Sequence, residues 1–226
     1  MTIKQSFSFA FNSKGSKGKL LRGGLFSFLF FTIFFAFVVA GYLMRLLCNS
    51  LEGRASKLPD WKNFSVLFSQ GVIPVLIILA YGSPFIITSI VENLLFAISG
   101  ELPALFWVFV TARLIFIIAF SILTPLALLH FAVKQNIAYG FKLGQMLKFL
   151  SLNFKHYFPV WLWSIVLNIA SLAGLIVFGI GFFFAGFAVA VIVTHLYAQA
   201  YRASIPFDDD KDGKLRSSMA IPPPLK

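Results

Sequence analysis

The segment from Tyr157 to Tyr201 runs for 45 residues without an aspartate, glutamate, lysine or arginine. One helical crossing of a bilayer core needs roughly 20 apolar residues, so this segment has the length of two crossings joined by a short turn. Gly179 and Gly181 lie near its middle, where such a turn is expected. This feature predicts an integral membrane protein built from α-helices.

The same apolar character extends over most of the chain. Hydrophobic residues make up 59% of it and charged residues 12%, about half the charged share of a soluble domain. We therefore predict an all-α integral membrane protein, a bundle of about five hydrophobic helices with two short amphipathic cytoplasmic helices. The five uncharged runs that predict the hydrophobic helices are residues 23–44, 71–91, 114–133, 157–178 and 180–201.

The first run, residues 23–44, follows a basic stretch but is longer than the roughly 7–15 apolar residues of a signal peptide. We therefore expect it to remain in the protein. It could cross the membrane fully or dip in and return as a hairpin. Residues 25–40 contain no Gly, Pro or Asn to form a turn, which favours a full crossing and leaves the hairpin as the alternative.

The lysines and arginines lie mainly between the apolar runs. Residues 1–22 carry five, residues 45–70 four, residues 134–156 four and the tail from Arg202 onward five. Membrane proteins keep basic residues on the cytoplasmic side. Placing the last three stretches in the cytoplasm accommodates 13 of these 18 cations and leaves the side of the N-terminal stretch open. The net charge of +11 then needs no nucleic-acid partner.

This pattern divides the chain into three parts: a basic N-terminal arm (1–22), a membrane helical bundle (23–203) and a disordered polar tail (204–226). The tail segment 208–213 resembles the opening of a calcium-binding loop. Met219 stands where such a loop needs a bidentate glutamate, so we expect no calcium site. The polar and proline-rich composition predicts disorder instead.

The first stretch with amphipathic helical spacing lies between the first two apolar runs. Asp60 is placed as an N-cap, and Trp61, Phe64 and Phe68 then fall on one helical face, with Lys62 on the opposite face. We predict a short amphipathic helix whose aromatic face packs on membrane or protein.

The second stretch lies between the third and fourth runs and places Lys148 and Lys155 opposite an apolar stripe. Short amphipathic helices with lysine on the polar face lie at the interface near anionic lipid headgroups. Both helices could pack beneath the bundle or dock a protein partner, and these alternatives stay open. The stripe consists of Leu143, Met146, Leu147, Leu150 and Phe154. The candidate interface residues are Trp61, Lys62, Phe64, Phe68, Lys148 and Lys155.

Arg113 interrupts a long apolar segment. Residues 103–133 would extend about 46 Å as a helix, longer than a bilayer core of about 30 Å. A crossing that starts at Leu114 places Arg113 at the outer surface, where Glu92 and Glu101 are the expected partners in an ion pair. The alternative is an intramembrane arginine with a role in transport.

The sequence contains no glycine-rich phosphate loop, no His-Glu-x-x-His and no Gly-x-Ser-x-Gly motif. His130, His156 and His195 are far apart, and no acidic residue lies near them in sequence to complete a metal site. The lone cysteine, Cys48, excludes an internal disulfide framework and a cysteine-based metal cluster. We expect neither an enzyme nor a bound cofactor or metal.

Several blocks of the chain are similar to a prokaryotic membrane family catalogued as domain of unknown function 4013, over about residues 15–203. The specific blocks are residues 41–53, 58–64 and 67–71, and the more diffuse ones are 125–132, 153–157 and 195–202. The resemblance implies a bacterial or archaeal membrane protein with no assigned activity, so it supplies no catalytic residues. A proline expected within the first apolar run is missing here, which also disfavours the hairpin.

Two functions remain in competition. The first is a non-catalytic multi-pass protein of a prokaryotic plasma (inner) membrane that anchors, assembles or regulates a partner protein complex. The alternative is a small transporter or the membrane subunit of a transport system, because Pro74, Pro84 and Pro125 could break helices at mid-depth. Against transport, the polar groups at membrane depth are few: Thr124, Asn168, Ser171 and Thr194.

Overall fold

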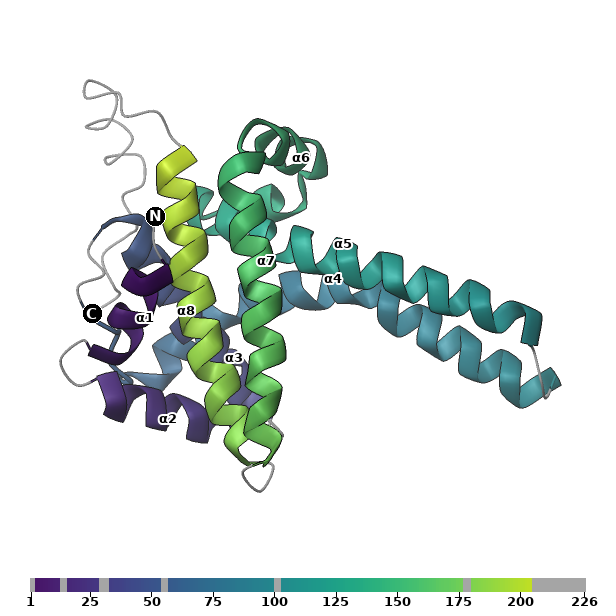
Figure 1. The fold of residues 1–226 in the computed structure, drawn as a ribbon, viewed down its shortest axis with the longest axis horizontal. Helices are drawn as coiled ribbons and strands as arrows, with labels where there is room; N and C mark the ends of the chain where they lie inside the picture. Colours follow the sequence, from purple (N-terminus) through teal and green to yellow (C-terminus); the bar gives the residue numbers. More distant parts are fainter. Residues whose placement is uncertain are drawn as a thin grey trace.

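The computed structural model describes residues 3–12, 16–28, 33–53, 57–99, 103–176 and 180–204, and within these ranges it contains no β-strand. Figure 1 shows α7 and α8 side by side, α1 and α2 against α8, and a long α4–α5 hairpin that leaves the body at a steep angle. The elements are α1 (Ile3–Asn12), α2 (Ser16–Phe28), α3 (Ile33–Leu51), α4 (Phe64–Ser99), α5 (Pro103–Lys134), the 3₁₀ helix η2 (Ile137–Phe141), α6 (Leu143–Leu152), α7 (Phe154–Ser171), the 3₁₀ helix η3 (Leu172–Ile176) and α8 (Ile180–Ser204).

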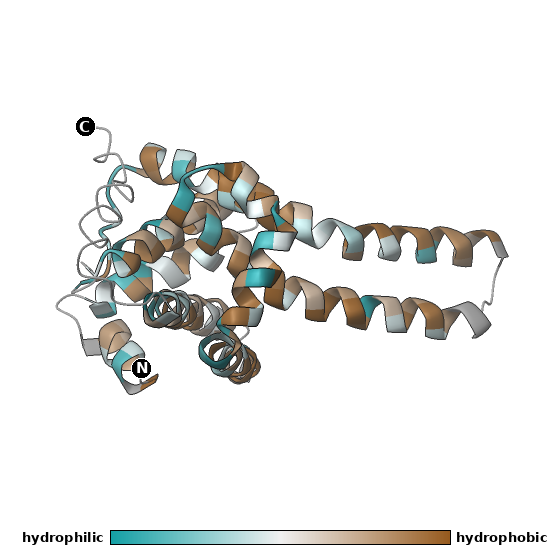
Figure 2. Cartoon of the chain, turned by 90° about the horizontal axis from the view of Figure 1, so that it is seen from above, coloured by the Kyte–Doolittle hydropathy of each residue, from teal (hydrophilic) through white to brown (hydrophobic). Residues whose placement is uncertain are grey.

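Five helical segments of the described chain are long and apolar enough to cross a membrane: α3, α4, α5, α7 with η3, and α8. This confirms the predicted class, an all-α membrane protein with about five hydrophobic helices. In Figure 2, hydrophobic residues cover most of the α4–α5 hairpin on the sides that no other element contacts. Lipid is the environment that accepts such a surface.

The charge-free segment forms the predicted helical pair, α7 continued by η3 and then α8. The two arms approach closely near the turn, because a Cβ atom added to Gly174 would lie 2.6 Å from the backbone carbonyl of Gly181. Small residues permit such close packing between membrane helices. Gly181 therefore belongs to α8 and provides a close helix contact, and not the turn that was predicted. Gly179 lies outside the described residues.

The first apolar run is not one helix, so the predicted crossing over residues 23–44 is wrong in its start. Its beginning belongs to α2, which lies across the lower end of α8 in Figure 1, and the segment able to cross is Phe34–Leu51 in α3. Gly23 and Gly24 lie directly against the rings of two α8 phenylalanines. Tertiary packing on α8 separates the two helices, although the sequence between them offers no turn residue.

The first predicted amphipathic helix is also corrected, because residues 57–63 are not helical and α4 begins at Phe64. Asp60 is therefore not an N-cap. Asn63 has a positive φ of 58° and its carbonyl accepts the first helical hydrogen bonds, from the amides of Val66 and Leu67. Asparagine tolerates this left-handed conformation better than most residues, and it sets the start of α4. Trp61 precedes the helix and is only 7% exposed.

The second predicted amphipathic helix is present as α6, near the top of Figure 1. It connects the end of α5, through η2, with the start of α7. Met146 is fully buried beneath it, whereas Leu143 and Leu147 of the same stripe are exposed. The amphipathic pattern thus predicted the helix correctly but only part of its burial.

Proline does not interrupt the long helices, so the predicted breaks at Pro74, Pro84 and Pro125 are absent. α4 continues for 36 residues and α5 for 32, which correspond to lengths of about 54 and 48 Å. Beside Pro84, the Ser83 hydroxyl donates to the carbonyl oxygen of Ala80 at 2.8 Å, four residues before the proline. Such bonds help to satisfy carbonyl groups that a proline leaves without an amide partner.

α3 and α4 cross in backbone contact at two glycines. A Cβ atom on Gly41 would overlap the carbonyl oxygen of Leu67, and one on Gly71 would overlap that of Phe37. Larger residues cannot occupy this crossing without moving the helices apart. The core lies around it, where α3, α4, α5 and α8 meet, and its largest fully buried aliphatic residues are Leu46, Leu67, Ile77, Leu126, Leu129, Ile192 and Leu196.

Candidate functional site

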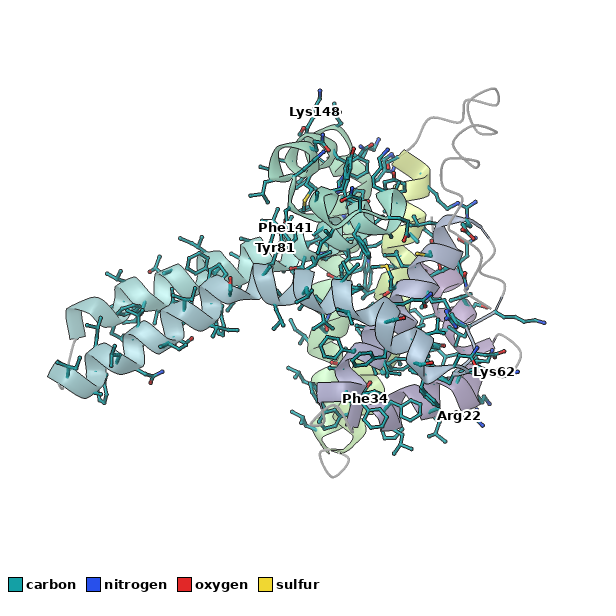
Figure 3. The ribbon with its side chains drawn as sticks, turned by 180° about the vertical axis from the view of Figure 1, so that it is seen from behind. Arg22, Phe34, Lys62, Tyr81, Phe141 and Lys148 are labelled. Carbon is teal, nitrogen blue, oxygen red and sulfur yellow. The ribbon has the colours of Figure 1, made fainter. Side chains whose placement is uncertain are left out.

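The residues predicted to share one interface lie in two separate places. Figure 3 shows Lys148 at the top of the molecule, whereas Lys62 lies far below it, near Arg22. Lys155 begins α7 beside α6 and so belongs with Lys148. The structure therefore contains no single surface that combines both predicted groups.

The contacts that Gly53 and Trp61 make with α8 show how far apart they lie along the body. Gly53 lies against the guanidinium group of Arg202, and Trp61 contacts the ring of Phe187. Arg202 and Phe187 are 15 residues apart on α8, a distance of about 22 Å along the helix. The chain thus descends along the body between Gly53 and Trp61. Gly53 and Trp61 therefore contact different levels of α8, and the cytoplasmic location of the stretch 45–70 stays a prediction.

The aromatic residues of the lower group contact aromatic rings of other elements. The Phe64 ring contacts that of Phe26 in α2, and the Phe68 ring stacks on that of Phe34 at 5.1 Å between centroids. The indole of Trp61 is buried, whereas Lys62 is exposed and the Phe64 side chain is 41% exposed. The alternative of packing against the bundle therefore describes this group.

Lys19 in α2 holds the segment before α4 in place. Its ammonium group lies 2.6 Å from Oδ1 of Asp60 and donates to the carbonyl oxygen of Leu58 at 2.6 Å, while Trp61 Nε1 donates to the Lys19 carbonyl oxygen at 3.0 Å. The hydrogen bond from Lys19 and its positive charge lower the pKa of Asp60. The basic arm is therefore on the same side of the molecule as residues 57–63.

The upper group forms an exposed apolar surface with lysines around it, the η2–α6 surface. Its exposed apolar residues are Ile137, Phe141, Leu143, Leu147 and Leu152, and its lysines are Lys142 and Lys148. Leu147 is 53% exposed and Leu152 74%. The surface lies between two membrane-spanning helices and outside both of them. Exposed apolar side chains of this kind indicate contact with lipid or a partner.

Several contacts fix the η2–α6 surface to the long helices. Tyr81 of α4 donates from its hydroxyl to the carbonyl oxygen of Gly140 at 2.7 Å, and its ring stacks on that of Phe141 at 5.8 Å (Figure 3). Asn136 caps η2 by accepting from the amide of Ala138 at 2.9 Å. The sequence contained this cap, but the 3₁₀ helix was not predicted.

Arg113 and Glu92 form an ion pair between α5 and α4. Their side chains are 30% and 22% exposed, and Arg113 Nε is buried without a hydrogen-bond partner among the described residues. The structure therefore brings together two of the three residues that the sequence analysis paired. Glu101 lies outside the described residues, and the location of the pair at the outer membrane surface stays a prediction.

A cavity of about 110 Å³ lies between α5, α6, α7 and α8. Aromatic and aliphatic side chains form its walls, and the sequence analysis did not predict it because the residues come from four separate helices. Tyr157, which lines the cavity, is 2% exposed and its hydroxyl has no hydrogen-bond partner within the described chain. The lining residues are Ile122, Leu126, Leu150, Phe154, Tyr157, Phe158, Trp161 and Tyr197.

The histidines do not converge. His195 stacks on Phe9 with 4.3 Å between ring centroids and bonds to Ser6, which joins α1 to α8. His130 Nδ1 lies 3.0 Å from the carbonyl oxygen of Leu126 in its own helix. In the described part of the chain, no three His, Cys, Asp or Glu side chains come together as a metal site would require.

Comparison with known protein families shows which family this chain belongs to. Residues 25–193 match the family described as "Protein of unknown function (DUF4013)". The chain belongs to this family. No curated protein and no solved structure matched the DUF4013 chain. The resemblance inferred from the sequence blocks is thereby confirmed.

In this DUF4013 protein, the specific sequence blocks form one packed region. Residues 41–51 form the second half of α3 and residues 52–53 the turn after it, and residues 58–71 comprise the segment before α4 and its first turns. The rings of Tyr42 and Trp61, one from each block, are stacked. The blocks that identify the DUF4013 family in this chain therefore lie in its structural core.

Three important residues of the DUF4013 protein were not recognised from its sequence. Lys19 had no feature beyond its charge, and its partners lie about 40 residues away in the chain. Tyr81 lies within an apolar run and Tyr157 at the start of one, where polar-tipped side chains are few. Because a buried tyrosine hydroxyl usually has a hydrogen-bond partner, a tyrosine in an apolar run could have indicated a specific contact at each of these positions.

Proposed function

We propose that the protein is a non-catalytic membrane scaffold of a prokaryotic plasma (inner) membrane that holds a partner protein on the η2–α6 surface. In this proposal residues 45–53 and 134–156 and the start of the tail face the cytoplasm. The observation that carries it is the exposed apolar stripe of α6, which is rigidly held outside the membrane-spanning helices beside lysines.

The composition of the η2–α6 surface supports a protein partner. Leu143 and Leu147 give it an exposed apolar centre, and Lys142 directly precedes Leu143 while Lys148 lies on the polar face of the same helix, so a partner with an apolar patch and acidic surroundings would be complementary. Anionic headgroups could neutralise the same lysines if the helix lay flat on the bilayer. The experiment below distinguishes these two occupants.

The rigidity of the surface adds further support. Met146 is fully buried, Tyr81 bonds to Gly140, and the Lys142 ammonium lies 3.8 Å from the centre of the Tyr139 ring. A surface that is already ordered loses less conformational entropy when a partner binds. α6 is therefore better suited to docking than a solvated loop between the same two helices.

The geometry gives transport less support. Asn168 donates to the carbonyl oxygen of Ser164 at 2.7 Å, and Ser171 donates to that of Asn168 at 2.7 Å, so both polar groups bond within α7. The described cavity is lined by apolar and aromatic residues and carries no charged group. A polar solute would find few ligands there. We therefore retain the scaffold and leave the transporter as the alternative that its failure would favour.

Site-specific photo-cross-linking tests the scaffold. A photoreactive amino acid at Leu147 should yield one discrete protein adduct in native membranes, whereas the same residue at Leu175, in η3 beyond the far end of α7, should yield lipid adducts. The Leu143→Glu variant should lose the protein adduct because a charge replaces an exposed apolar contact. Gln145→Glu is the matched control on the same helix and should keep it.

The opposite result would contradict the scaffold. If Leu147 gave the same lipid adducts as Leu175, with no protein adduct, the η2–α6 surface would be a membrane-resting surface and the scaffold would lose its support. Membrane insertion of each variant is checked by extraction with detergent before the cross-linking yields are compared. This check separates a lost contact from a lost fold.

A further inference from the structure

The cavity between α5, α6, α7 and α8 has the properties of a site for a hydrocarbon chain. Its volume is about 110 Å³. An apolar cavity of about 150 Å³ can hold benzene, so this cavity fits a short piece of an alkyl chain and not an entire lipid. Phe154 and Phe158 line it and are also exposed on α7, so the cavity opens toward the lipid-facing side of that helix.

Among the polar-tipped residues that line the cavity, Tyr157 has a buried hydroxyl without a hydrogen-bond partner in the described part of the chain. Tyr157 is almost fully buried, and no described group accepts a hydrogen bond from its hydroxyl. Burying such a donor unpaired is unfavourable. A ligand that combines a hydrocarbon chain with a carbonyl oxygen would fill the cavity and satisfy the hydroxyl together. The ester groups of a glycerophospholipid are such carbonyls.

The residues around the cavity indicate that the headgroup end of a lipid would lie beside it. Tyr157, Trp161 and Tyr197 gather at the cavity, and tyrosine and tryptophan are enriched where the bilayer meets water. Lys155 precedes Tyr157 by two residues and is exposed, and Lys148 extends from α6 at the top of Figure 3. A phosphate beside these lysines would place the ester groups and the upper chain next to the cavity.

We propose that this cavity binds the upper acyl chain of one anionic phospholipid, with its phosphate beside Lys155 and an ester carbonyl accepting from Tyr157. The site takes Leu150 from α6, whereas the proposed partner surface takes the exposed Leu143 and Leu147 of the same stripe. It does not depend on a protein partner. A bound lipid would contact α5, α6, α7 and α8 together, and it would thereby stabilise the position of α6.

Trp161 lines the cavity and provides a direct reporter. A variant that keeps Trp161 alone is made by changing Trp61, Trp107 and Trp163 to Phe. It is reconstituted in phosphatidylcholine vesicles that contain a low mole fraction of phosphatidylglycerol with brominated acyl chains, which quench tryptophan fluorescence on contact. We expect quenching about tenfold more efficient per brominated lipid than with brominated phosphatidylcholine, since the phosphate of an anionic lipid pairs with lysine.

Matched variants identify the site. Leu150→Phe fills the cavity and should abolish the excess quenching, whereas Ile169→Phe, an exposed position of α7 outside the cavity, should keep it. Tyr157→Phe retains the shape of the side chain and should weaken the excess severalfold. Lys155→Gln should remove the preference for phosphatidylglycerol over phosphatidylcholine.

Two results would overturn the proposal. Quenching that follows the mole fraction of brominated lipid for both headgroups, unchanged by Leu150→Phe, would mean that Trp161 meets only bulk lipid. Equal excess quenching by both lipids would show a chain site without the anionic headgroup and would contradict the role of Lys155. Neither result bears on the photo-cross-linking at Leu147, so the two proposals fail independently.

Discussion

The indole ring of Trp61 stacks on the phenol ring of Tyr42 with 4.0 Å between the centroids and 7° between the planes. Both rings also contact Phe187 of α8 at 5.7 Å. One aromatic cluster therefore joins α3, the segment before α4, and α8. Because Trp61 also donates to the carbonyl oxygen of Lys19, the cluster includes α2.

Trp61→Ala should destabilise the fold by about 3–5 kcal/mol, because it removes a buried aromatic side chain and leaves a cavity among four elements. Trp107→Ala is the control, since Trp107 is an exposed tryptophan on the α4–α5 hairpin. The fraction of monodisperse protein that survives heating in detergent measures both effects. Similar survival of the two variants would contradict the structural role of Trp61.

Gly41→Ala should separate α3 from α4, because the added methyl group would overlap the carbonyl oxygen of Leu67. We expect a loss of about 1–3 kcal/mol or more from overpacking. Gly186→Ala in α8 provides the matched control. A Cβ atom there meets no other group within 4 Å, so helix propensity should leave the fold unchanged or slightly more stable. Thermal stability in detergent compares the two.

Arg113→Lys should retain the fold and the ion pair with Glu92, because either cation can pair with the carboxylate. Arg113→Leu should cost about 1 kcal/mol, the upper end for partly exposed pairs, because Glu92 then remains in the hairpin without its partner. The double variant Arg113→Leu, Glu92→Leu should recover part of this loss in a double-mutant cycle. Loss of a cellular phenotype in Arg113→Lys with normal expression would instead indicate recognition of an anion.

Asp60 predicts a weak dependence of stability on acid. Its pKa in the folded protein is lowered by the hydrogen bond and charge of Lys19, so the carboxylate contributes stability above its unfolded pKa of about 3.9. This contribution is lost as the pH falls through the lower, folded value. The side chain is largely exposed, so the contribution is about 0–1 kcal/mol. The stability gap between the wild type and Asp60→Asn should be constant near neutral pH and should close in acid.

The proposed orientation is tested by cysteine accessibility. Gln145→Cys, in a background where Cys48 is replaced by Ser, should resist an impermeant thiol reagent added to intact cells, because α6 would face the cytoplasm. The same cysteine should react after the membrane is permeabilised, since Gln145 is exposed on α6. Ready labelling in intact cells would reverse the proposed orientation of the whole bundle.

Features that depend on local composition were predictable from the sequence. The absence of charge over residues 157–201 specified two helices without knowledge of their neighbours, because backbone groups inside a bilayer must bond internally. The pairing of Arg113 with Glu92 was also inferred, since a charge beside an apolar segment needs an opposite charge. The amphipathic spacing of residues 143–152 correctly indicated α6.

Features that depend on distant contacts were not predictable. Trp61, Phe64 and Phe68 have helical spacing, yet the chain enters α4 only after Asn63, because the indole is held by Tyr42 and by the backbone of Lys19. The division between α2 and α3 likewise follows from packing on α8. The cavity required the positions of four helices, and no short-range pattern contains that information.

The lengths of the two helical pairs have a consequence for their orientation in a bilayer. α4, about 54 Å long, would fit a core of about 30 Å from end to end only if inclined by roughly 55°, whereas α8, about 37 Å long, would need roughly 35°. Inclinations to opposite sides would together give roughly a right angle. Figures 1 and 2 show that the α4–α5 hairpin and α8 run in clearly different directions. The α4–α5 hairpin and the α7–α8 pair would then tilt in opposite directions in the membrane, and lipid would fill the space between them.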